Sequence, residues 1–62
     1  MAQRLVDRYP LHGRVEILLA DERWHAGRVV AHEHPGVWVK TDNGRAWFVT
    51  NTRRIRPEEN RP

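Results

Sequence analysis

The sequence has 62 residues, and its 11 lysine and arginine residues outnumber its 8 aspartate and glutamate residues, giving a formal net charge of +3. A chain of this length forms one small domain, which buries only about 60% of the surface that the unfolded chain exposes. The absence of cysteine excludes disulfides and thiolate metal sites, and it fits the reducing cytoplasm. No apolar run approaches the roughly 18 residues of a membrane span, and the N-terminus leads into no apolar signal core. We therefore expect a single cytoplasmic domain that does not contact membranes.

Arginine dominates the positive charge, because Lys40 is the only lysine. The planar guanidinium group suits phosphate and carboxylate, and it stacks on flat rings. The same bias also arises from a GC-rich genome or from adaptation to heat. The composition therefore permits nucleic-acid binding without establishing it.

Proline and glycine divide the chain into short runs rich in valine, tryptophan and isoleucine, which predicts a small all-β barrel or sandwich. A short helical turn is expected near residues 2–7. The first strand is expected over residues 14–20, with alternate residues facing the core at Val15, Ile17 and Leu19. Leu18 interrupts the alternation, so we expect the N-terminal arm to cover it through Leu5 or Val6.

The second strand is expected over residues 23–33, and Trp24 at its start is expected to pack on or beside the core. Gly27 is interpreted as a β-bulge, which bends the strand and resets the alternation of its side chains. After this bulge, the core side of the strand is expected to hold Val29 and Ala31.

Asp-Asn-Gly at residues 42–44 is the strongest hairpin signal, because asparagine and glycine tolerate positive φ. The remaining elements are expected at residues 37–41 (third strand), 45–50 (fourth strand), 51–54 (one helical turn) and 55–56 (a short fifth strand). The predicted organisation is an N-terminal arm (1–12), a barrel (13–57) and a disordered tail (58–62).

The order of these elements resembles that of the SH3-like small β-barrels, in particular Tudor and KOW-type modules and the C-terminal DNA-binding domain of retroviral integrases. The residues that carry the resemblance are Trp-His-Ala-Gly-Arg-Val-Val at 24–30, Asp-Asn-Gly at 42–44 and Ile-Arg-Pro at 55–57. The resemblance covers residues 13–57. It implies a five-stranded SH3-like barrel with one short helical turn before the last strand. It also implies binding of nucleic acid or of short peptides along the sheet face and loops.

A plasmid-borne, trimethoprim-insensitive type of dihydrofolate reductase is also built from such barrels, and its fourth strand carries the motif Val-Gln-Ile-Tyr. Residues 46–49 read Ala-Trp-Phe-Val instead, so we do not expect that activity. The chain lacks serine as well as cysteine, the common nucleophiles of acyl transfer. Its carboxylates are scattered over turns and the tail. We expect no catalytic residue, no cofactor and no enzyme activity.

Trp47 and Phe48 are neighbours, so a strand cannot bury both on one face. Val49 precedes the basic turn, a position that is buried in SH3-like barrels. If Val49 points inward, Trp47 does too, and Phe48 points outward beside Trp38. An exposed aromatic pair of this kind suggests a stacking platform for bases or an apolar patch for a partner. The alternative is an aromatic pair covered by the N-terminal arm, including Tyr9.

Two further kinds of site are weighed and not predicted. His32 and His34 would share one strand face and could hold a metal with a third ligand, but a solvated strand end is the preferred explanation. An aromatic cage for methylated side chains needs three or four rings around one pocket, and the sequence shows no such convergence.

The basic residues form two groups, one on the helical turn and last strand and one on the second to fourth strands with their hairpin. A phosphate backbone could follow the second group, with Trp38 stacking between the cations. The predicted nucleic-acid-binding residues are Arg28, Trp38, Lys40, Arg45, Phe48, Arg53, Arg54 and Arg56. We therefore expect a small module that binds DNA or RNA with low sequence specificity. The alternatives are a protein-interaction module, such as a phage or plasmid accessory factor, a homo-oligomer assembled through the same aromatic face, or a merely solvated charged face.

Overall fold

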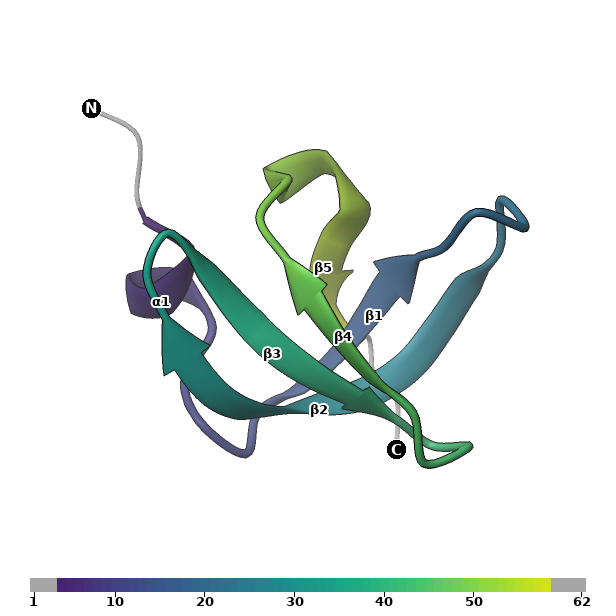
Figure 1. Cartoon of the computed structure of the whole chain (residues 1–62), viewed down its shortest axis with the longest axis horizontal. Coiled ribbons are helices and arrows are strands. Elements are labelled where there is room, and N and C mark those ends of the chain that lie inside the picture. The colour runs from purple at the N-terminus through teal and green to yellow at the C-terminus, as the bar shows by residue number, and fades with distance from the viewer. Residues whose placement is uncertain (1–3, 59–62) are drawn as a thin grey trace.

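A computed structural model of the chain describes residues 4–58 and shows five antiparallel strands in one strongly twisted sheet (Figure 1). The elements are α1 (Leu5–Arg8), β1 (Arg14–Leu18), β2 (Trp24–Glu33), β3 (Gly36–Thr41), β4 (Ala46–Val49), the 3₁₀ turn η1 (Thr52–Arg54) and β5 (Ile55–Pro57). The strand order is β4-β3-β2-β1-β5. The predicted all-β class, with one short helical turn before the last strand, is confirmed. The open five-stranded sheet is compatible with a small barrel-like fold.

The core lies on the inward face of the curved sheet, where alternate side chains of every strand meet. Val15, Ile17, Val29, Val37 and Val39 are almost completely buried there. The inward alternation predicted for the first strand is thus confirmed at its first two core positions. Leu19 lies just beyond the end of β1 and packs against this core while remaining partly exposed.

The β-bulge lies at Val30 and not at Gly27, which corrects the sequence prediction. Gly27 pairs in regular register with β1 and β3, whereas the pairing shifts between Val29 and Ala31. Ala31 therefore lies opposite Trp38 on the outer face, and its predicted place on the core side is wrong. Gly27 is required for a different reason: a Cβ atom there would lie 2.5 Å from the carbonyl oxygen of Lys40.

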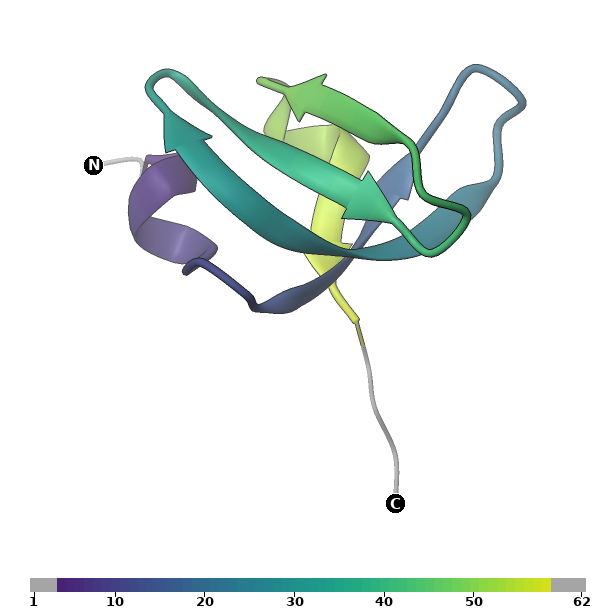
Figure 2. The same cartoon turned by 60° about the horizontal axis from the view of Figure 1, so that its bottom comes forward.

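The N-terminal segment closes one end of the core, and both views show α1 beside the end of β2 (Figures 1 and 2). Leu5 and Tyr9 are buried, and the Tyr9 hydroxyl donates a hydrogen bond of 3.3 Å to the carbonyl oxygen of Ile55. The sequence predicts that this arm covers Leu18. In the structure Leu5 and Val6 lie in and against the core, and Leu18 borders a groove described below.

The two ends of the chain are only partly described. Glu58, predicted as the first residue of the tail, is half-buried, and its carboxylate accepts a 2.8 Å hydrogen bond from Arg14 Nε. The rest of the predicted disordered tail, residues 59–62, lies outside the described residues, as does the start of the predicted turn at residues 2–7.

We predict that Gly27→Ala lowers the free energy of unfolding by about 3 kcal/mol, the upper range for overpacking, because backbone atoms of β3 and not a side chain would have to move. Urea denaturation measures this change. Gly44→Ala is the matched control, because nothing lies within 4 Å of a Cβ atom built at this position. Only the φ of +90° disfavours alanine there, so we expect the free energy of unfolding to fall by about 1 kcal/mol. A Gly27→Ala protein as stable as the Gly44→Ala protein would contradict this packing.

Candidate functional site

Three cations form a row across the outer face of the sheet, which is the face turned away from the core. Arg14 of β1 lies opposite Arg28 of β2, and Arg28 lies opposite Lys40 of β3. All three side chains are exposed. We call Arg14, Arg28 and Lys40 the basic row.

An aromatic pair lies next to the basic row, on β3 and β4. Trp38 is two residues from Lys40 along β3 and lies directly opposite Phe48. The ring centroids are 5.1 Å apart and the planes are tilted by 42°. Phe48 is 41% exposed, and Trp38 is partly buried. The prediction that Val49 points inward and Phe48 outward beside Trp38 is therefore confirmed.

Trp47 takes the opposite side of the sheet, as the alternation requires. Its ring packs against the core, and its Nε1 donates a 3.3 Å hydrogen bond to Thr41 Oγ1. This hydrogen bond satisfies the polar atom of a largely apolar side chain. Trp47 thus holds β4 against β3 and keeps Phe48 on the outer face.

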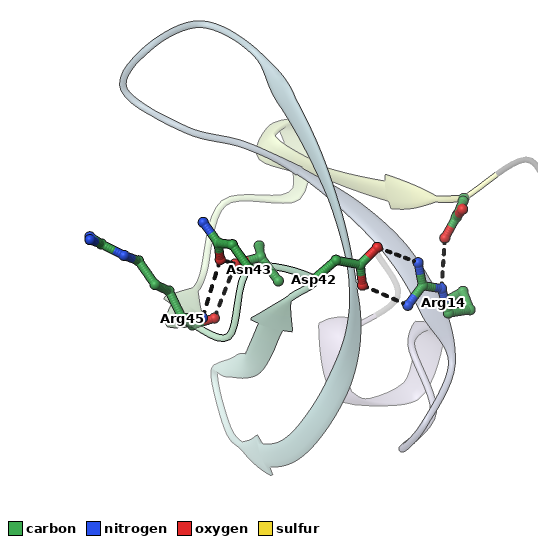
Figure 3. A network of polar contacts seen from close by, with 6 residues as sticks. Arg14, Asp42, Asn43 and Arg45 are labelled. Atoms are coloured by element: carbon green, nitrogen blue, oxygen red, sulfur yellow. Dashed lines mark hydrogen bonds and ion pairs between the residues drawn. The ribbon is translucent and has the colours of Figure 1, made fainter.

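Arg14 is held by two carboxylates, as Figure 3 shows. Its two terminal nitrogens donate to the two Asp42 oxygens at 3.0 Å each, and its Nε donates to Glu58 at 2.8 Å. The hydrogen bonds from Arg14 hold the pKa of Asp42 below its usual value, and the nearby charge of Arg28 acts in the same direction. Arg28 and Lys40 themselves form no ion pair with any residue in the described part of the chain. They carry the free charge of the basic row.

The β3–β4 hairpin carries Arg45, whose carbonyl oxygen accepts a hydrogen bond from the amide of the buried residue Thr41. The side-chain oxygen of Asn43 accepts hydrogen bonds from the Arg45 amide at 3.2 Å and from the Thr41 hydroxyl. Gly44 has a φ of +90°, which the predicted Asp-Asn-Gly turn requires. The exposed Arg45 side chain points away from the Arg14–Asp42 pair in Figure 3.

A carboxylate, that of Glu33, lies beside one ring of the aromatic pair. Trp38 Nε1 donates a 2.9 Å hydrogen bond to Glu33 Oε1, which orients the indole ring. The negative charge at Glu33 repels phosphate from that side. A polyanion would therefore approach Phe48 from the side of Lys40.

Arg56 belongs to a separate cluster on the same face. Its Nε donates a 2.7 Å hydrogen bond to Glu16 Oε1, and its guanidinium carbon lies 3.9 Å from the centroid of the Trp24 ring. Trp24 therefore lies on the outer face beneath this cation, whereas the sequence predicted that it packs on or beside the core. The charge of Arg56 is largely compensated by Glu16.

Arg53 and Arg54 lie on η1, which follows the Val49 end of β4, whereas Lys40 pairs with the Ala46 end. Asn51 caps η1 by accepting a 2.9 Å hydrogen bond from the Arg53 amide. The predicted set of eight residues thus divides. Arg28, Trp38, Lys40 and Phe48 share one continuous surface. Arg45, Arg53, Arg54 and Arg56 are not part of it.

Sequence reasoning missed a groove of about 180 Å³ between β4 and the end of β1. Its walls are residues 17–19, residues 47–51 and Arg54. Two parts of the chain far apart in the sequence, residues 17–19 and residues 47–54, form it, so no local pattern predicts it. The one available signal was Leu18, an apolar residue at an outward position.

Within residues 4–58 no group of three or more histidine, cysteine, aspartate or glutamate side chains is placed to hold a metal ion. His32 Nε2 instead lies 2.7 Å from the carbonyl oxygen of Tyr9. The described helices include none that is long and apolar enough to cross a membrane. Comparison of the chain with protein-family models, curated proteins and solved structures found no match.

Because Asp42 is paired with Arg14, we predict that the protein becomes less stable in acid. Because the pKa of Asp42 is lower in the folded than in the unfolded chain, the unfolded chain takes up this proton first as the pH falls. The stabilisation is present above the ordinary aspartate pKa of about 4 and disappears as the pH falls through the lower pKa of the folded state. We expect both Asp42→Asn and Arg14→Gln to flatten the fall of unfolding free energy between about pH 5 and 2, with the larger effect from Asp42→Asn, because Arg28 still lowers the pKa of Asp42 when Arg14 is replaced.

Urea denaturation at several pH values measures this fall. The double variant serves as the control, because without the Asp42 carboxylate the loss of Arg14 should leave the pH dependence of Asp42→Asn unchanged. An unchanged pH dependence in both single variants would contradict the pairing.

Proposed function

We propose that this protein is a small SH3-like module that binds DNA or RNA with low sequence specificity. Binding would take place through the outer face of β2, β3 and β4. The observation that carries the proposal is the position of Arg28 and Lys40, two cations with no ion pair within residues 4–58, directly beside the partly exposed aromatic pair. The proposal includes no catalytic activity, and the absence of cysteine favours a cytoplasmic location.

The chemistry of this surface suits a nucleic-acid strand. Arg28 and Lys40 are cross-strand neighbours and can contact phosphates of one backbone. Phe48 offers a ring face on which a base can stack, and every base has such a face, so stacking carries little sequence preference. Stacking also requires an unpaired base. We therefore expect single strands to bind more tightly than duplexes.

A protein partner on the same face is the second candidate, and Glu33 favours it. Its carboxylate beside Trp38 gives the aromatic pair a mixed electrostatic character that is unusual for a phosphate-binding surface. A partner or a second copy of the chain would use Trp38 and Phe48 as its main anchor. Sedimentation of the isolated protein tests self-assembly.

Arg28→Gln and Lys40→Gln should each lower the slope of log affinity against log salt concentration by about one unit, because each removes one phosphate contact. Fluorescence anisotropy of a labelled oligothymidylate, titrated over a range of salt concentrations, measures this slope. Arg23→Gln is the matched control, since it removes the same charge from the exposed β1–β2 loop. Equal slopes in all three variants would contradict the assigned surface.

Phe48→Ala should weaken binding of the oligothymidylate by about 1–3 kcal/mol through the loss of base stacking, while the salt slope stays that of the unchanged protein. Phe48→Trp is the positive control, because it keeps a ring at this position. Affinity that is unaffected by Phe48→Ala would argue against a stacking role. Loss of a protein partner, with oligonucleotide binding intact, would favour the second candidate.

A further inference from the structure

The outer edge of β4 is open. β4 is the terminal strand of the sheet and pairs only with β3 among residues 4–58. Figure 1 shows β4 next to β3, with its other edge turned toward β1 and β5. An open edge of this kind is a template on which another extended segment can pair.

The hydrogen-bond alternation determines which backbone groups face this edge. The Thr41 amide donates to the Arg45 carbonyl oxygen at 2.8 Å, so residues 45, 47 and 49 use their backbone groups to bind β3. The residues between them, Ala46 and Phe48, therefore direct their N–H and C=O groups away from the sheet. The edge offers two donors and two acceptors in strand geometry.

The groove of about 180 Å³ runs alongside this edge. It is smaller than the roughly 300–1,000 Å³ of a typical small-molecule site, so it suits one side chain better than a cofactor. Leu18, Leu19 and Trp47 make its walls largely apolar. An extended segment paired with β4 would direct alternate side chains toward these walls.

Arg54 is the one charged residue of the groove wall. Its Nη1 lies 3.5 Å from the Leu18 carbonyl oxygen, and it takes part in no ion pair within the described residues. No carboxylate lines the groove, and Arg53 is exposed next to it. A second copy of the chain would bring a net charge of +3 and the same arginines, so the charge favours an acidic occupant.

We propose that the β4 edge and its groove bind an extended segment of a partner protein by β-strand addition. An apolar side chain of that segment enters the groove, and an acidic side chain lies beside Arg54. This site uses the backbone of Phe48 and the groove, whereas nucleic acid would use the Phe48 ring and the basic row. The two sites can therefore be tested separately.

Hydrogen exchange of the ¹⁵N-labelled full chain, followed by NMR, tests the site. The probe is a capped octapeptide in which valine and glutamate alternate along one face and threonine occupies the other face, prepared in both registers. We expect saturable binding that slows exchange of the Ala46 and Phe48 amides about tenfold or more, since these amides gain hydrogen-bond partners. The octapeptide with lysine in place of glutamate should bind more weakly. An N-methylated version that cannot form the strand hydrogen bonds should not bind.

Arg54→Gln should weaken binding of the glutamate peptide by about two- to fivefold, the size of a partly exposed ion pair. Arg28→Gln is the matched control and should leave peptide binding unchanged, although it weakens oligonucleotide binding. The amide spectrum of each variant verifies its fold.

Three results would overturn the proposal. The first is unchanged exchange at Ala46 and Phe48 at saturating concentrations of both peptide registers. The second is peptide-induced shifts centred on Arg28 and Lys40 in place of the groove. The third is protection of the two amides without peptide in a sedimenting dimer, which would assign the edge to a second copy. None of these results affects the oligonucleotide measurements, so the two proposals fail independently.

Discussion

The alternation of side chains along β3 determines both the core and the surface of this small protein. Val37, Val39 and Thr41 point inward and are buried, so Trp38 and Lys40 must point outward. β3 is paired on both sides, with β2 and with β4. These pairings determine which side chains of β2 and β4 face inward and which face outward. A slip of one residue in either pairing would exchange the two faces completely.

The two strands that pair with β3 differ in how regularly their side chains alternate. β4 keeps strict alternation, so Trp47 packs inward and Phe48 joins Trp38 outside. β2 is longer and inserts the extra residue Val30, which places small Ala31 opposite Trp38. A small residue there leaves the indole ring accessible. The bulge therefore shapes the surface that we propose for binding.

Much of this arrangement could be predicted from the sequence, because local chemistry determines it. The Asp-Asn-Gly turn located the β3–β4 hairpin, and the adjacent Trp47 and Phe48 forced one ring outward. The bulge could not be located, because Gly27 looks like a bulge glycine. Its actual role, allowing close approach of the β3 backbone, depends on tertiary contact. The Arg56 contact with Trp24 and the groove beside β4 also join segments distant in the sequence, so no local pattern predicts them.

We propose that the outer face beside Trp38 binds nucleic acid, and the indole N–H signals of the three tryptophans can test this proposal. Trp38 lies on the proposed surface, Trp24 is covered by Arg56, and Trp47 packs against the core. In a titration of the ¹⁵N-labelled protein with an oligothymidylate at low salt, we predict a saturable shift of the Trp38 indole signal and little change in the other two. A Trp38 signal that stays unchanged at saturation, or equal shifts of all three, would contradict it.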